Sequence, residues 1–217
     1  MPVAAVVTVL AGIALGALDF AFQKTLPYPW ANLANSSAVW AVAAFALGYW
    51  IFALGWIRKR GLRGATAESG PREASAKSGL RGAIAGAAML VIAVPSYYAT
   101  ATLVQQDDVA NIWSSTSLLW MGFGLLAGAV FGAAGVWAHA TGWQRIVATA
   151  LPGAVLLAEA ARLGHRGEVG TAVIEAALGV LVIMVVGRTA RQRIIALGVA
   201  VPLAALGFVG FAVAGFA

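Results

Sequence analysis

The chain has 217 residues, of which 61% are hydrophobic and only 10% are charged, and its formal net charge is +6 at pH 7. A soluble domain carries roughly 25% charged residues, so this composition excludes an ordinary soluble protein and predicts an integral membrane protein. The chain contains no Cys and only two His, which lie far apart, so we expect no disulfide framework, no metal centre and no cofactor.

Seven apolar runs, each near the length of about 20 residues that crosses the hydrocarbon core as a helix, occur along the chain. They cover residues 2–22, 37–57, 82–104, 116–138, 146–163, 170–187 and 194–217. We therefore predict an all-α fold, a polytopic transmembrane bundle of about seven spans that forms a single domain over residues 1–217. The first run is full-length and has no Lys or Arg before it, so we expect a retained helix rather than a cleaved signal peptide.

Residues 58–80 separate the second run from the third and differ from both in composition. This stretch is rich in Arg, Gly and Ser and has no apolar periodicity, so we expect a mobile basic loop. Elsewhere, small residues recur every four positions in "GLLAGAVFGAAG", which favours close helix packing in lipid. Pro95, Pro152 and Pro202 fall inside three of the runs, where each removes a backbone hydrogen bond and favours a kink.

The basic residues predict the orientation of the bundle. Eleven of the 14 Lys and Arg follow the second, fourth and sixth runs, whereas only Lys24, Arg162 and Arg166 belong to the opposite side. The positive-inside bias then places the N-terminus in the cytoplasm and the C-terminus outside, in a multi-pass protein of the inner (plasma) membrane. The basic loop has no interleaved aromatic residues, so we expect it to face membrane lipids and not nucleic acid.

The acidic residues gather at the opposite end from most of the basic ones. Six of the eight map toward the outer half of the bundle, namely Asp19, Asp107, Asp108, Glu159, Glu168 and Glu175. Three of the six, Asp19, Glu159 and Glu175, lie within apolar runs. A charge there costs about 2.5–3.5 kcal/mol on insertion scales unless it is paired, protonated or facing a cavity. These three are therefore candidate site residues.

Each intramembrane acid also has a structural interpretation. Glu159 is followed three residues later by Arg162, and the two can form an ion pair on one helix face. Asp19 can be held by Gln23, one turn later, or by polar groups of the outer loop. Glu175 has only small and aliphatic neighbours on its own helix face, so any partner must come from another helix, or the side chain lines a cavity.

The adjacent acids Asp107 and Asp108 also allow two interpretations. They can form a solvated turn or cap a short helix that begins near Val109. Because the pair lies close to the aromatic residues of the outer half, Asp108 is kept as a fourth catalytic candidate.

Aromatic and polar side chains are expected at the same level as the acids. They are Phe20, Asn35, Trp40, Tyr97, Tyr98, Trp113 and Trp120. Trp and Tyr also form belts at both interfaces of ordinary membrane proteins, which is the structural alternative. Trp residues occur at the other end of the chain's spans as well, so it is the coincidence with carboxylates that makes these seven residues candidates for binding a substrate.

Carboxylic acids beside aromatic rings suit one kind of intramembrane chemistry. A carboxyl group among apolar side chains favours its protonated form and can donate a proton, and aromatic faces stabilise nearby cations. Such a site can protonate a lipophilic isoprenoid and guide the carbocation through ring closure while excluding water. Glu159 is the leading candidate donor, with Asp19 and Glu175 as alternatives. The only adjacent acids, in "QQDDVAN", do not make a DDxxD diphosphate motif, so protonation is the expected mode.

The stretch "LANSSAVWAVAAFALGYW" resembles a segment of small bacterial multi-pass membrane proteins. In size, seven-span layout and embedded acids, the chain is similar to bacterial membrane-bound terpene cyclases that close drimane-type rings on prenylated indole alkaloids. This resemblance implies a membrane-bound cyclase that acts on a prenylated, lipophilic small molecule. The resemblance concerns the overall architecture of the whole chain, and it does not assign a role to any individual residue.

Two other classes of protein remain open. A small proton-coupled transporter would use the same acids as a proton relay, although the odd number of spans and the lack of a clear duplication do not favour inverted repeats. A non-catalytic membrane interaction protein would need no cavity, and its acids would face headgroups or pair with Arg. A cavity bounded by the carboxylates would separate an enzyme from that class.

Overall fold

A computed structural model describes residues 3–63 and 76–213, and over these residues the chain is helical with short connections. Seven helices are long and apolar enough to cross a membrane. They are α1 (Val3–Thr25), α3 (Ser37–Arg63), α4 (Ala76–Gln105), α5 (Ser115–Trp137), α6 (Gly142–His165), α7 (Val169–Val186) and α8 (Ala190–Val213). The all-α, seven-span prediction is confirmed for a multi-pass membrane protein.

Two of the helices extend further than expected. α3 continues to Arg63 and α4 begins at Ala76, so both ends of the stretch expected to be a loop, 58–80, are helical. Arg, Lys and Ala are good helix formers, and a helix can continue past the hydrocarbon once its side chains reach the polar interface. The middle of the expected loop, residues 64–75, lies outside the described residues.

Two short elements join the spans. The five-residue helix α2 (Trp30–Ala34) lies between α1 and α3 and was not expected from the sequence. The 3₁₀ helix η1 (Val109–Trp113) precedes α5, and the Asp108 side chain caps it by accepting a hydrogen bond from the backbone N–H of Ala110, at 2.9 Å. The capping interpretation of Asp108 is therefore confirmed.

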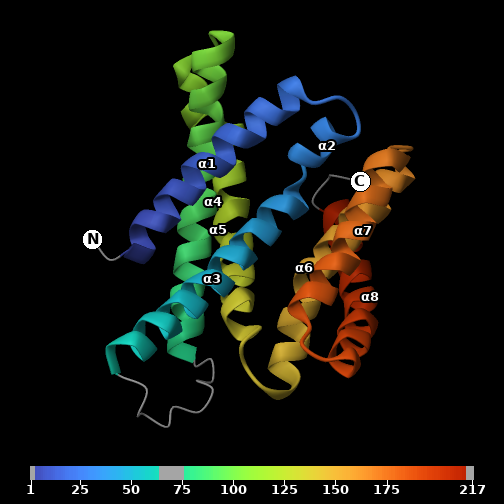
Figure 1. Cartoon of the computed structure of the whole chain (residues 1–217). Coiled ribbons are helices and arrows are strands. Elements are labelled where there is room, and N and C mark those ends of the chain that lie inside the picture. The colour runs from blue at the N-terminus through green and yellow to red at the C-terminus, as the bar shows by residue number, and fades with distance from the viewer. Residues whose placement is uncertain (1–2, 64–75, 214–217) are drawn as a thin grey trace.

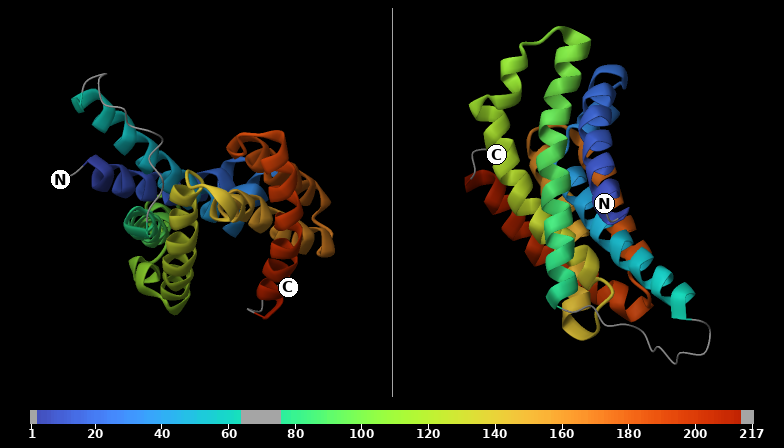
Figure 2. Two further views of the ribbon diagram at one scale, coloured as in Figure 1. Left: turned by 90° about the horizontal axis from the view of Figure 1, so that it is seen from below. Right: turned by 90° about the vertical axis from the view of Figure 1, so that its left-hand side faces the viewer.

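The spans form two groups (Figure 1). In the first group α4 packs against α1 and α5, and α3 crosses α4 and α5. In the second group α6 packs between α7 and α8. Seen from below, α6–α8 gather on one side of the molecule, while α1, α4 and α5 lie on the other (Figure 2). The groups meet where α6 contacts α3 and α5 and where α2 contacts α7.

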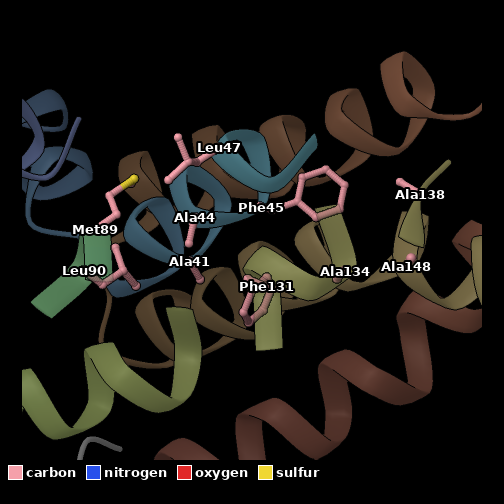
Figure 3. Packing of buried hydrophobic residues seen from close by; sticks show 10 residues of the cluster. All are labelled: Ala41, Ala44, Phe45, Leu47, Met89, Leu90, Phe131, Ala134, Ala138 and Ala148. Atoms are coloured by element: carbon pink, nitrogen blue, oxygen red, sulfur yellow. The ribbon is translucent and has the colours of Figure 1, made fainter. Parts of the chain in front are cut away.

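The buried core lies where α3 crosses its neighbours, and many of its side chains are small. Ala41, Ala44 and Phe45 of α3 pack with residues of α4, α5 and α6 (Figure 3). Between α4 and α5 the backbones touch: a Cβ atom built on Gly86 would lie 2.2 Å from the carbonyl oxygen of Gly128. Close approach through Gly and Ala replaces the bulky apolar core of a soluble protein, as expected for helices associating in lipid.

The two ends of the bundle differ in charge. One end, which we call the acidic end, comprises the C-terminal part of α1, α2, residues 106–114 and the turn 166–168. All six acidic residues of the described part of the chain lie toward this end, in agreement with the sequence-based expectation. The other end, which we call the basic end, includes the turns 138–141 and 187–189.

Candidate functional site

A cavity of about 210 Å³ lies toward the acidic end, between α1, α3, α4 and α5. Its wall is mostly apolar and aromatic, with one carboxylate and a few small polar groups. The lining residues are Asp19, Asn35, Ser36, Ser37, Trp40, Leu90, Val94, Tyr97, Tyr98, Trp120, Phe123, Gly124 and Ala127. Six of them, Asp19, Asn35, Trp40, Tyr97, Tyr98 and Trp120, are residues that the sequence singled out.

Asp19 supplies the carboxylate of the cavity wall from the last third of α1, and only 7% of its surface is exposed. The Gln23 side chain donates a hydrogen bond to Oδ2, at 3.1 Å, and accepts one from the Tyr97 hydroxyl, at 3.3 Å. The indole of Trp40 lies close enough to interact with the carboxyl group. Even so, Oδ1 is buried and has no hydrogen bond of normal length and angle with any described residue. The expected Asp19–Gln23 contact is confirmed, and one carboxyl oxygen is left available to a bound molecule.

Aromatic rings form much of the rest of the wall. Tyr97 and Tyr98 meet edge to face, with centroids 5.4 Å apart, and Trp120 and Phe123 meet in the same way at 5.9 Å. Phe20 is buried behind the wall, where its ring supports Tyr97 edge to face at 5.4 Å. Phe20 therefore positions a lining residue and is not itself among the lining side chains. Ring faces on several sides of a small cavity can stabilise a cation inside it.

Glu159 is not among the lining residues, contrary to its expected place in the site. Its Oε2 accepts hydrogen bonds from the Ser36 hydroxyl at 3.1 Å, the Ser37 hydroxyl at 2.9 Å and the Ala38 backbone N–H at 2.6 Å. Its Oε1 forms a salt bridge with Arg162, at 2.7 Å. Both oxygens already accept hydrogen bonds, and the two Ser stand between the carboxylate and the cavity. The ion-pair interpretation of Glu159 is thus confirmed. Because Glu159 does not line the cavity, it is not placed to donate a proton to a molecule bound there.

Glu175 is fully buried in α7 and also does not line the cavity. It interacts with Ser36, Glu159 and Arg162, so its partners come from other helices, as its sequence neighbours required. Neither carboxyl oxygen has a hydrogen bond of normal geometry with a described residue. Glu175 therefore belongs to the polar contact between the two helix groups.

Further polar contacts extend this junction toward the acidic end. The Asn32 side chain donates to Glu168, at 2.5 Å, and the Tyr28 hydroxyl accepts the backbone N–H of Gly170, at 2.9 Å. The Thr171 hydroxyl reaches the carbonyl oxygen of Pro29, at 3.4 Å. The segment around α2 thus fastens the first helix group to the start of α7.

Two further predicted site residues, Trp113 and Asp108, also lie away from the cavity. Trp113 belongs to η1, is 69% exposed and does not line the cavity, because the 3₁₀ helix stands beyond the end of the spans. Asp108 is exposed and caps η1. The structure therefore gives Asp108 a capping role and leaves Trp113 outside the cavity lining.

Ser36, Ser37 and Phe123 line the cavity but were not among the predicted site residues. Ser36 stands directly before the second apolar run and Ser37 is its first residue, the positions at which Ser caps a helix, and the Ser36 hydroxyl accepts the backbone N–H of Val39 at 3.2 Å. That signal predicts the cap. It carries no information about the Glu159 carboxylate, which approaches from a helix more than a hundred residues later in the chain.

Among the described residues, no three His, Cys, Asp or Glu come together as a metal site would require. The comparisons with known proteins give one match. A model of a family of unknown function, DUF6518, matches residues 1–70 and 71–215. No curated protein and no solved structure matches the chain. Since the family model spans nearly the whole chain, the protein is a member of the DUF6518 family.

Proposed function

We propose that the protein is a membrane-bound terpene cyclase that protonates a lipophilic isoprenoid, such as a prenylated small molecule, and guides the carbocation through ring closure. The observation that carries the proposal is the buried Oδ1 of Asp19, which has no hydrogen bond of normal geometry with a described residue and belongs to a carboxyl group in the wall of an aromatic cavity. Asp19 is the proposed proton donor, in place of Glu159.

The proposed reaction conserves all atoms of the substrate. The carboxyl O–H of Asp19 breaks as its proton adds to one carbon of an alkene, and the π electrons form the new C–H bond. The neighbouring carbon becomes cationic and is attacked by a second alkene, which closes a ring. Loss of a proton from a carbon adjacent to the new cation, to the Asp19 carboxylate, forms an alkene, restores the neutral acid and releases a cyclic isomer. No cofactor is needed for these steps.

The aromatic wall supports this proposal because the intermediates are cations. Aromatic and aliphatic side chains make up most of the lining, including Trp40, Tyr97 and Trp120, so a cation formed there would lie close to aromatic rings. The cavity volume of about 210 Å³ is below the range of about 300–1,000 Å³ typical of ligand pockets. It suits the reacting end of a substrate whose remaining length extends into the lipid.

Glu159 and Glu175 are less suited to donate a proton. Glu159 already accepts hydrogen bonds from Ser36, Ser37 and Ala38 and pairs with Arg162. Glu175 is fully buried and is not a lining residue. In the orientation that the basic residues favour, the cavity lies in the outer half of the inner (plasma) membrane, where a lipid-soluble substrate arrives laterally.

The test is turnover of a polyprenyl or prenylated-indole substrate by purified protein in lipid nanodiscs. Asp19→Asn removes the acidic proton but keeps the side-chain volume, so we expect turnover to fall by about 10²- to 10⁴-fold while the protein still folds. Asp108→Asn is the matched control, because the same change at an exposed capping residue should leave the rate near that of the natural chain.

Equal turnover by the natural chain and Asp19→Asn would refute Asp19 as the donor. Proton-coupled movement of an unchanged substrate across liposomes, abolished by Asp19→Asn, would show the transporter alternative instead. If no isoprenoid is bound or converted, the non-catalytic alternative is favoured.

A further inference from the structure

The basic end contains a second group of polar side chains, unrelated to the cavity. His139 in the turn between α5 and α6 lies against Arg188 in the turn between α7 and α8, with Nδ1 of the imidazole 3.4 Å from Nη2 of the guanidinium. The imidazole Nε2 lies 3.3 Å from the carbonyl oxygen of Tyr49, and its ring stacks on that of Tyr49, with centroids 4.2 Å apart. Arg145, in the first turn of α6, is near enough to interact electrostatically with both His139 and Arg188.

His139 holds Arg188 without adding a positive charge. Burial and the two neighbouring guanidinium groups lower the pKa of the imidazole below its ordinary value of about 6.5. A neutral imidazole that donates its Nε2–H to the Tyr49 carbonyl has Nδ1 free to accept a hydrogen bond from Arg188. The ring therefore fixes the direction of the guanidinium.

Arg145 is short of acceptors in the described part of the chain. Its Nε and Nη2 are buried and have no hydrogen-bond partner there. A buried donor without an acceptor costs about 1–3 kcal/mol, and more when it is charged, so such groups in native proteins are normally satisfied by a ligand, ion or water.

The electrostatic environment of this group favours an anion. All carboxylates among the described residues lie toward the acidic end, on the other side of the bundle. The N-termini of α6 and α8 both lie at the basic end, where the unpaired N–H groups of a helix carry partial positive charge. The basic end thus contains two guanidinium groups, those of Arg145 and Arg188, and two helix N-termini. No acidic side chain among the described residues lies at this end.

We propose that Arg145 and Arg188, the latter positioned by His139, bind a phosphate-bearing anion at the basic end of the bundle. A planar guanidinium presents paired N–H donors that match the oxygens of a phosphate, whether this is the headgroup of an anionic phospholipid or a soluble phosphate. The site is separate from the Asp19 cavity, and the proposal does not depend on the reaction proposed there.

The test compares the thermal stability of the purified full-length chain in three settings. These are phosphatidylcholine nanodiscs, nanodiscs with added phosphatidylglycerol, and phosphatidylcholine nanodiscs with inorganic phosphate at constant ionic strength. An increase in Tm with phosphatidylglycerol assigns the site to a lipid headgroup, and an increase with inorganic phosphate assigns it to a soluble anion. Either increase should saturate with ligand concentration.

Substitutions identify the residues that bind. Arg188→Gln should weaken anion binding by about 10- to 100-fold, the weight of one charge-assisted hydrogen bond, and Arg145→Gln should do the same. Arg191→Gln is the matched control: it removes an equal charge from the exposed start of α8, three residues after Arg188, and should keep the response. If Arg145→Gln fails to fold, Arg145→Lys keeps the charge but loses paired donation, and an intermediate affinity is expected.

Three results would overturn the proposal. The first is that neither ligand changes the Tm of the natural chain. The second is an equal loss of response in Arg191→Gln and Arg188→Gln, which would show general attraction to a basic surface. The third concerns Glu68 and Glu73, which lie outside the described residues. A response that appears only after both are changed to Gln would mean that the chain's own carboxylates are the ligands.

Discussion

The carboxylate of Glu159 accepts a 2.6 Å hydrogen bond from the backbone N–H of Ala38, 121 residues earlier in the chain. This N–H belongs to the first turn of α3, whose donors have no partner within their own helix. Glu159 therefore caps α3 from another helix group, and its salt bridge with Arg162 is one of several contacts at the same group.

The first prediction concerns this cap. Glu159→Gln removes the negative charge that Arg162, Ser36 and Ser37 surround and leaves the largely buried Arg162 side chain with a neutral partner. We expect the free energy of unfolding to fall by about 3–5 kcal/mol, the usual effect of removing one partner of a buried ion pair. Thermal unfolding in nanodiscs measures the change.

Arg162→Met is the comparison for this variant. It breaks the ion pair but leaves the α3 donors their acceptor, so its loss of stability should be smaller. An unchanged Tm in Glu159→Gln would contradict the capping role.

The second prediction concerns the contact between α4 and α5. A Cβ atom on Gly128 would lie 2.4 Å from the carbonyl oxygen of Gly86, so Gly128→Ala must push the two helices apart. We expect it to cost about 1–3 kcal/mol, the range for overpacking a tight core. Gly122→Ala, in the same helix with open space around its added methyl group, should be neutral or slightly stabilising. Equal Tm values for the two variants would count against this packing.

The third prediction concerns the pH dependence of stability. Since the pKa of His139 is lower in the folded protein than in the unfolded chain, the unfolded chain binds more protons below pH 6.5 or so. Above that pH, His139 should not affect the free energy of unfolding. As the pH falls from there toward the pKa in the folded protein, the free energy of unfolding should decrease progressively. His139→Phe keeps a ring to stack on Tyr49 and Phe52 but cannot be protonated. The difference in Tm between pH 7.5 and pH 5 should be smaller in this variant; an equal difference would exclude His139 as the cause.

The fourth prediction concerns orientation. Eleven of the 14 basic residues follow the second, fourth and sixth apolar runs, and the described chain has seven candidate spans, so the positive-inside bias predicts an extracytoplasmic C-terminus. An alkaline phosphatase fused after Ala217 should be active, because this reporter works outside the cytoplasm. A green fluorescent protein fused at the same place should not fluoresce, because it does not fold correctly when it is exported unfolded. The opposite pattern would place the Asp19 cavity in the cytoplasmic half.

The spans could be predicted because each is a local property of the sequence. An apolar run near 20 residues long predicts its helix without knowledge of the neighbours, and α3 begins at Ser37, the residue expected. The contacts Asp19–Gln23 and Glu159–Arg162 were also foreseen, because both join residues one helical turn apart.

The arrangement of the site could not be predicted in the same way. Whether Glu159 or Asp19 faces the cavity depends on how α6 and α1 are rotated against α3, and apolar residues surround every span. Helices in lipid lack a polar face that would reveal this rotation. α2 was missed for a different reason: at five residues it is too short for a periodic pattern, and tertiary contacts such as Asn32–Glu168 accompany it.

The late position of Glu159 in the chain has a consequence for biogenesis. The donors around its carboxylate, on residues 36–38, are synthesised more than a hundred residues before it. When α6 leaves the translocon, helices α1–α5 have already been made, and the donors on residues 36–38 still lack the Glu159 carboxylate as their acceptor. Docking onto these donors offsets part of the cost of placing a carboxylate among lipids, so the order of synthesis itself assists the insertion of α6.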